Sequence, residues 1–140
     1  MCINVIAATD CLVDVIFIVD ESLSVRTSNY DLMKSFVSQL VGRLDIDNGD
    51  TRVGLVTYAE VVNTAQAFNL SAHMSVASVQ AAISSLTYTG SVTVTHLALA
   101  YVRTTMLTLA AGDRPGVPNV VVIMTDGSSY NATATQVCTT

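Results

Sequence analysis

The sequence predicts an α/β domain with a doubly wound, mostly parallel sheet, one antiparallel edge strand and helices on both faces. Two segments, 13–19 and 119–124, have the nearly continuous Val, Ile and Phe content of strands buried on both faces of a parallel sheet. Between them, three segments with apolar residues at helical spacing alternate with two closely spaced strand segments. The resulting order of strand, helix, two strands, two helices and strand is typical of layered α/β folds.

Composition and charge narrow the class of protein further. A chain of 140 residues with 51% apolar and 12% charged residues suits one domain with a large core and excludes intrinsic disorder. The net charge of −5 repels phosphate backbones and anionic lipids, so we expect no nucleic acid partner. The longest apolar run, 97–102, is far below the roughly 20 residues that cross a bilayer, so we expect no membrane span.

The first helix is predicted directly after the first strand. Ser28 and Asp31 resemble a capping box at its start. Its apolar face repeats at helical spacing and comprises Tyr30, Met33, Phe36, Val37, Leu40, Val41 and Leu44. The segments 51–58 and 61–68 follow, separated only by Ala59 and Glu60, and predict an antiparallel hairpin at one edge of the sheet.

Two further helices, over 75–86 and 95–111, and the strand 119–124 complete the predicted sheet. No later strand follows to cover the outer edge of that last strand, and an exposed apolar edge is a liability. We therefore expect a partial domain over residues 1–140, with an extension over 1–12 and further elements missing after Thr140. The first residues make a poor secretion signal and indicate a cut end.

Polar side chains follow both central strands. Asp20 ends the first strand and Asp126 follows the last, so on neighbouring strands the two carboxylates would face each other at roughly 5 Å and repel without a cation. Ser22 and Ser24 add hydroxyl oxygens from the same loop as Asp20. Few carboxylates with neutral oxygens, and no His or Cys, favour Mg²⁺ or Mn²⁺ over a Ca²⁺ cage.

Several separated motifs carry a resemblance to a known family. They are Asp20-x-Ser22-x-Ser24, Thr-x-Thr-x-x-Ala-Leu over 93–99, Thr125-Asp126-Gly127, Thr-Arg-Val-Gly-Leu-Val-Thr-Tyr over 51–58, and Ala-Ile-x-x-Leu over 82–86 before Gly90. Together they resemble the von Willebrand factor type A (VWA) domain from about residue 14 to 127. Leu23 and Ser91 stand where many members have glycine, and neither change removes a ligand.

The resemblance implies a Rossmann-like fold with a metal-ion-dependent adhesion site (MIDAS). Its Mg²⁺, replaceable by Mn²⁺, would be held by Asp20, Ser22, Ser24, Thr93 and Asp126, with Thr95 as the alternative to Thr93. An acidic side chain of a partner fills the open metal position in this family. The resemblance therefore implies a secreted, non-enzymatic adhesion module of the extracellular matrix that binds a protein such as collagen or another matrix protein.

Three other classes of protein share parts of this pattern. Intracellular VWA-type assembly modules share the same motifs. A haloacid-dehalogenase-like phosphatase also presents an aspartate after a strand, but Ser22 stands where its general acid belongs and no lysine follows Lys34. A dinucleotide-binding domain needs a glycine-rich turn, which residues 20–27 lack.

The remaining polar residues predict no chemistry. Glu21 is expected to be a solvated loop charge, with the position of an acceptor beside the metal as the alternative, and His73 and His96 are expected to be surface residues. The sequons at Asn69 and Asn131 are about as many as chance gives in a chain rich in Ser and Thr. The three cysteines allow either one internal disulfide or buried thiols; they are Cys2, Cys11 and Cys138.

Overall fold

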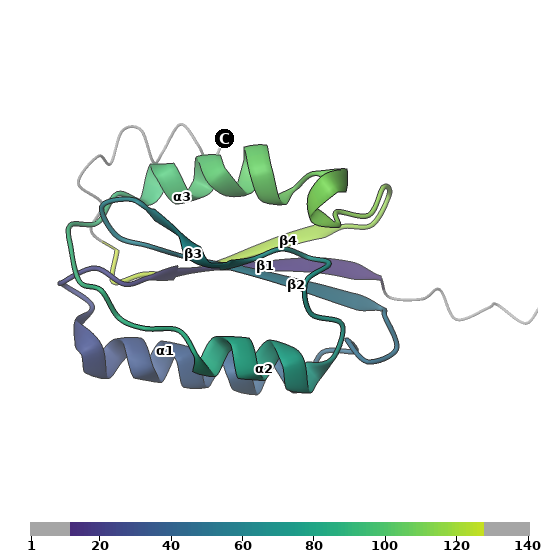
Figure 1. Ribbon diagram of the computed structural model, residues 1–140, viewed down its shortest axis with the longest axis horizontal. Helices are drawn as coiled ribbons and strands as arrows, with labels where there is room; N and C mark the ends of the chain where they lie inside the picture. Colours follow the sequence, from purple (N-terminus) through teal and green to yellow (C-terminus); the bar gives the residue numbers. More distant parts are fainter. Residues whose placement is uncertain (1–11, 128–140) are drawn as a thin grey trace, which may run out of the picture.

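The computed structural model describes residues 12–127 as a four-stranded sheet between two helical layers (Figure 1). The strand order is β3-β2-β1-β4, with β1 parallel to both neighbours and β2 antiparallel to β3. The strands are β1 (Val13–Asp20), β2 (Thr51–Tyr58), β3 (Val62–Phe68) and β4 (Asn119–Met124). This confirms the mostly parallel sheet and its antiparallel edge hairpin.

Helices cover both faces of the sheet. Helices α1 (Arg26–Val41) and α2 (Val76–Ser84) lie side by side on one face, and α3 (Thr95–Tyr101) lies on the other (Figure 1). Each face of β1 therefore meets a helical layer, as a doubly wound fold requires. Among the described residues, none of the helices combines the length and apolar character that crossing a bilayer takes.

Strand β1 supplies side chains to two hydrophobic cores. Phe17 and its alternate neighbours pack with α1 and α2, whereas Ile16 and Ile18 pack with α3. Because side chains alternate across a strand, a run of apolar residues fills both layers at once. Phe17, Ile16 and Ile18 are fully buried, and each contributes about 1.5 to 3 kcal/mol through removal from water.

The start of α1 differs from the predicted capping box. The helix begins at Arg26 after Val25, which provides no side-chain cap, so Ser28 lies inside the first turn. Arg26 has a φ of 64°, a left-handed conformation that residues other than glycine rarely adopt, and it turns the chain into the helix early. Phe36, expected on the apolar face, is 55% exposed.

Helix α2 confirms the second predicted helix and begins at a genuine capping box. The Ser75 side chain accepts from the Ser78 backbone N–H at 3.2 Å, and the Ser75 backbone N–H donates to Ser78 Oγ at 3.3 Å. Two backbone donors that an α-helix leaves unpaired at its start are satisfied in this way.

The predicted continuous helix over 95–111 is wrong in its second half. Helix α3 ends at Tyr101 and continues as a π-helical turn, Val102–Met106, closed by the Leu107 N–H on the Val102 carbonyl at 2.9 Å. Thr104 Oγ1 donates to the Ala100 carbonyl at 2.8 Å, a local bond that bends helices. Leu109, expected on the buried stripe, is 72% exposed beside a short 3₁₀ turn.

Strand β4 is more exposed than its apolar sequence predicts. It pairs only with β1 in the part of the chain that the structure describes. Val120, Val121 and Ile123 are 44%, 38% and 37% exposed. Val122 and Met124 pack against the core between the sheet and helices α1 and α2. The expected burial of this strand on both faces is therefore wrong for residues 12–127, and the expected exposed apolar edge is present.

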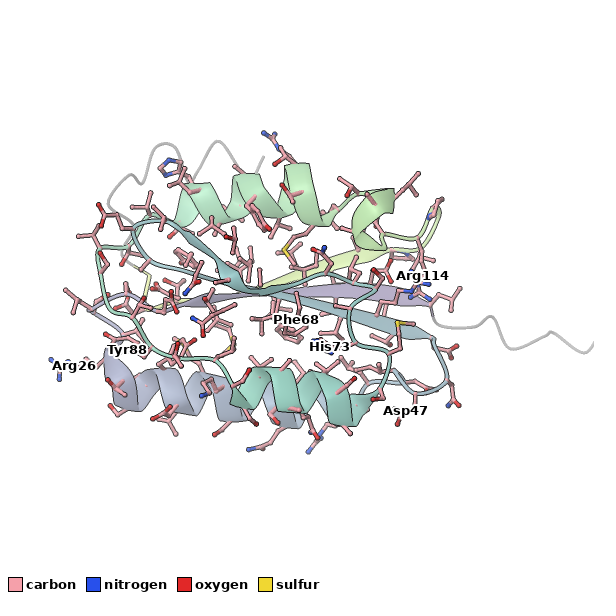
Figure 2. All side chains as sticks on the ribbon, in the orientation of Figure 1. Arg26, Asp47, Phe68, His73, Tyr88 and Arg114 are labelled. Carbon is pink, nitrogen blue, oxygen red and sulfur yellow. The ribbon has the colours of Figure 1, made fainter. Side chains whose placement is uncertain are left out.

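An ion pair fixes the end of the sheet where β1 begins. Asp14 is fully buried, and Arg114 Nε and Nη2 approach its Oδ1 at 2.8 and 2.7 Å. The same guanidinium donates to the carbonyls of Val13, Gly49 and Asp50. Figure 2 shows Arg114 at the opposite end of the molecule from Arg26 and Tyr88. This cluster joins the starts of β1 and β2 to the segment that leads into β4.

Candidate metal centre

The loop after β1 brings two serine hydroxyls together beside Asp20. Asp20 is the last residue of β1 and is fully buried. Its Oδ1 accepts from the Ser22 N–H at 2.9 Å, which tightens the loop. The hydroxyl oxygens of Ser22 and Ser24 then lie 3.1 Å apart, with Ser22 buried and Ser24 exposed. The structure thus brings together the three residues that the sequence predicts for the first loop.

The loop after β4 reaches Asp20 through a threonine. Val19 pairs with Met124, so the residue beside Asp20 is Thr125, whose Oγ1 donates to Asp20 Oδ2 at 2.7 Å. The expectation that Asp126 faces Asp20 directly is wrong by one position. Asp126 follows Thr125 as an exposed side chain at the same edge. The two carboxylates therefore belong to adjacent loops, and the Thr125 hydroxyl is the group of the last loop that hydrogen-bonds Asp20.

The loop before α3 joins the same edge of the sheet. The Leu23 N–H donates to the Ser91 carbonyl at 2.8 Å, and the Val94 N–H donates to the Ala59 carbonyl at 2.9 Å. The Tyr88 hydroxyl donates to the Ser22 carbonyl at 3.0 Å. The Leu23 and Tyr88 bonds hold the second loop against the first, and the Val94 bond holds it against the turn between β2 and β3.

Thr93 and Thr95 occupy different positions in this loop. Thr95 Oγ1 lies 3.1 Å from the Tyr58 hydroxyl, which donates to Asp20 Oδ2 at 3.4 Å. Thr93 is 8% exposed and precedes the first turn of α3. The structure connects Thr95 to Asp20 through Tyr58, and the role of Thr93 as a metal ligand stays a prediction.

Glu21 is buried, and its expected position as a solvated charge is wrong. The side chain is 2% exposed. Its Oε1 accepts from Asn63 Nδ2 and Thr89 Oγ1, each at 3.0 Å, and its Oε2 accepts from Gln66 Nε2 at 3.3 Å. This carboxylate therefore joins the loop after β1 to β3 and to the loop before α3.

The electrostatic environment of the site favours a cation. No Lys or Arg side chain contacts Asp20 or Glu21 in residues 12–127, although both carboxylates are buried. Burial raises the pKa of Tyr58, and the charge of Asp20 raises it further, so its hydroxyl remains a neutral hydrogen-bond donor. A buried carboxylate without a positive partner is costly unless a cation or hydrogen bonds compensate.

The donor chemistry fits a hard divalent cation. Asp20, Ser22, Ser24 and the second-loop threonines present only oxygen atoms, which suit Mg²⁺. Within the described ranges, no three His, Cys, Asp or Glu side chains gather as a metal-binding group. A cation here would therefore depend on hydroxyl oxygens in addition to the carboxylates of Asp20 and Asp126.

Three residues of this network were not assigned a role from sequence. Tyr58 and Thr125 lie within motifs that the sequence singles out, and their position at the ends of β2 and β4 is the signal that places them beside Asp20. Glu21 gave no such signal, because its partners on β3 come together with it only in the fold.

The two histidines are both half buried. His73 is half buried and packs edge-on against Phe68, with ring centroids 4.9 Å apart (Figure 2). His96 is half buried in the first turn of α3. The cysteines lie outside the described residues.

A doubly wound sheet with hydroxyl- and carboxylate-bearing loops at the carboxyl ends of its parallel strands defines a class of α/β domains with a candidate binding edge. Residues 14–139 match the von Willebrand factor type A domain family, and the chain belongs to this family. Matrilin-1 of Gallus gallus is 37% identical over 118 residues, which cover 84% of this chain and 24% of matrilin-1. Vitrin of Mus musculus is 35% identical over 118 residues, which cover 84% of this chain and 18% of vitrin. The chain thus spans a quarter or less of the length of these relatives.

Solved structures show the same fold. Proximal thread matrix protein 1 from the mussel byssus superposes with a TM-score of 0.82 at 27% identity, covering 91% of this chain and 34% of that chain. Another structure of that protein, with a zinc-occupied MIDAS motif, gives a TM-score of 0.76 at 27% identity over 84% of this chain and 32% of that chain.

Proposed function

We propose that the chain is a non-enzymatic adhesion module that binds an acidic group of a protein ligand through a Mg²⁺-occupied MIDAS. The observation that carries this proposal is the buried Asp20 carboxylate, which has no Lys or Arg partner in residues 12–127 and lies beside the paired hydroxyls of Ser22 and Ser24. Asp20, Ser22, Ser24, Thr93 and Asp126 would hold the metal, and Mn²⁺ would replace Mg²⁺.

The chain's own residues give the site its selectivity for an acidic ligand. When bound, the metal supplies a Lewis-acidic position for a carboxylate oxygen. Thr125 and Tyr58 hold Asp20 by hydrogen bonds, and Glu21 holds the first loop against β3. Two carboxylates leave the metal site with little excess negative charge, so an incoming carboxylate is attracted.

The proposed location is the extracellular matrix, and the proposed partner is a matrix protein such as collagen. Matrilins and vitrin are extracellular matrix proteins, and the name of the byssus protein also describes a matrix protein. The zinc-occupied MIDAS of the byssus protein supports a divalent cation at the corresponding edge of this fold.

Asp20→Asn tests the metal site. Mg²⁺ titration followed by amide NMR should shift resonances of Ser22, Ser24, Thr93 and Asp126 in the wild type, with EDTA reversing the shifts. The amide side chain keeps a hydrogen-bond acceptor but loses the charge, so Mg²⁺ affinity should fall by more than the roughly 10- to 100-fold that loss of an outer-shell partner costs. The unfolding free energy without metal should change by only about 1 kcal/mol.

Asp31→Ala is the matched control, because Asp31 is an exposed acid of α1 outside the proposed ligand set. It should keep the wild-type Mg²⁺ affinity.

A solid-phase assay on fibrillar collagen and other matrix proteins, with and without EDTA, then tests the ligand class. Wild-type binding that persists in EDTA and in Asp20→Asn would contradict a metal-dependent mechanism.

A further inference from the structure

The turn after β3 carries an exposed asparagine in a glycosylation sequon. Asn69-Leu70-Ser71 fits the pattern Asn-x-Ser, and Asn69 and Ser71 are both exposed whereas Leu70 is fully buried. We propose that Asn69 is an N-glycosylation site of this domain. The inference rests on the extracellular location in the proposed function, because N-linked glycans are added in the secretory pathway.

The Asn69 side chain is free to carry a glycan without loss of a contact. Its amide has no hydrogen-bond partner among residues 12–127, whereas its backbone carbonyl accepts from the Ala72 N–H at 3.1 Å and closes a tight turn. Leu70 anchors this turn in the core beside α3. The backbone is therefore fixed by buried contacts while the asparagine amide projects from the surface.

The position of the turn separates a glycan from the candidate metal centre. Val62 pairs with Tyr58 near the metal loops, and Phe68 pairs with Leu55 farther down β2. Because β3 bulges between these pairs, the separation follows the three residue steps from Tyr58 to Leu55 on β2, about 10 Å at the rise of a β-strand. Figure 2 shows Phe68 and His73, which flank the turn in sequence, well away from Tyr88 at the metal-loop end. A glycan at Asn69 would therefore start from the middle of the sheet, about three residues along β2 from the candidate metal centre.

The glycan would also lie at the end of an edge strand. Strand β3 pairs only with β2 in the described sheet. Unpaired strand edges are templates for pairing with other chains, and bulky hydrophilic groups nearby oppose this. A glycan at Asn69 would thus hinder edge-to-edge association through β3.

The transfer step balances with a lipid-pyrophosphate-linked oligosaccharide as the donor. The Asn69 amide nitrogen forms a bond to C1 of the first sugar and loses one proton. The bond between that C1 and the pyrophosphate oxygen breaks, and the lipid pyrophosphate leaves with the electron pair. No oxidant or reductant takes part.

Expression of the chain behind a cleavable secretion signal in mammalian cells tests the proposal. Peptide mass spectrometry with and without peptide N-glycosidase is applied to both the medium and the cell extract. The peptide with Asn69 should carry a glycan in the wild type and in Asn131→Gln. Asn69→Gln and Ser71→Ala should both lose it, and Ser71→Ala keeps the asparagine itself, which separates loss of the sequon from loss of the residue.

An unmodified Asn69 in both fractions would overturn the inference. The proposed function is measured independently, by Mg²⁺ titration of the enzymatically deglycosylated protein. Glycosylation without Mg²⁺ binding would contradict the metal site alone, and Mg²⁺ binding with an unmodified Asn69 would contradict this inference alone.

Discussion

Asp20 and Glu21 are neighbours in the chain, and both are buried for different reasons. Asp20 points to the edge where the loops after β1 and β4 meet, and Thr125 and Tyr58 donate to it. Glu21 points toward β3 and is held by amide and hydroxyl donors. Sequence reasoning identified the first residue because a strand-ending aspartate is a recognisable pattern. It missed the second because Asn63 and Gln66 lie 42 and 45 residues away in sequence.

The position opposite Asp20 shows a second limit of sequence reasoning. The sequence indicated that the ends of β1 and β4 meet, and they do. Which residue of the last segment lies beside Asp20 depends on the strand register, and a shift of one residue exchanges Asp126 for Thr125. Both strands are apolar along their length, so their side-chain pattern contains little information about register.

Tyr30→Phe should stabilise the domain at neutral pH. The Tyr30 ring is 1% exposed, and its hydroxyl has no hydrogen-bond partner in residues 12–127. Removal of an unpaired buried hydroxyl should raise the unfolding free energy by up to about 1 kcal/mol, measured by urea unfolding. Tyr101→Phe serves as the control, since Tyr101 is only partly buried. Equal effects of the two substitutions would contradict this explanation.

The same variant tests the alkaline pH dependence. Burial raises the pKa of Tyr30, and the charges of Glu21 and Asp31 raise it further. In the unfolded chain a tyrosine ionises near pH 10, so above that pH the unfolded state loses a proton that the folded state keeps. Wild-type stability should therefore fall as pH rises above about 10, and Tyr30→Phe should reduce this fall. Parallel slopes for both proteins would contradict the assignment.

Arg114→Ala should be the most destabilising of these substitutions. It leaves the fully buried Asp14 carboxylate without its ion-pair partner and removes donors from three backbone carbonyls. Loss of one member of a buried pair costs about 3 to 5 kcal/mol. Arg103→Ala, at an exposed arginine, should change the unfolding free energy by less than about 0.5 kcal/mol in the same urea experiment. The double variant Asp14→Asn/Arg114→Met should recover part of the loss, and no recovery would contradict the charge argument.

At the scale of elements, the strands and the second helix were predictable from local patterns. The apolar run of β1, the closely spaced segments of β2 and β3, and the stripe of α2 each match the observed element within two residues. The end of the third helix was not predictable, because apolar residues continue at helical spacing through 102–111. The backbone instead changes to a π-helical turn at Val102. Threonine hydrogen bonding to the backbone there competes with regular helical pairing, which periodicity does not detect.

The capping box of α2 makes a direct prediction. Ser75→Ala removes an acceptor for the Ser78 N–H and should lower the unfolding free energy by about 1 kcal/mol. Ser35→Ala, at an exposed position inside α1, should instead raise it by up to about 0.5 kcal/mol, because alanine favours helix interiors. An unchanged or raised unfolding free energy of Ser75→Ala in chemical denaturation would show that the observed cap contributes little.

At the scale of the whole molecule, metal binding and stability should be linked. A ligand that binds only the folded state stabilises it, by about 2.7 kcal/mol when its free concentration is 100 times its Kd. Millimolar Mg²⁺ should therefore raise the thermal midpoint of the wild type, and EDTA should remove the increase. Asp20→Asn should show no such increase. A flat response of the wild type across millimolar Mg²⁺ would contradict the proposed site.

The central position of β1 also affects how the chain is made. Its partner β4 is the last strand within residues 12–127: Arg114 lies 100 residues after Asp14, and Thr125 lies 105 residues after Asp20. During translation, the apolar side chains of β1 emerge from the ribosome long before β4 exists to pair with them. Pairings between distant segments form slowly and leave apolar surface exposed in the meantime. The nascent domain therefore keeps the apolar surface of β1 exposed until the segment that carries Arg114 and β4 has been synthesised.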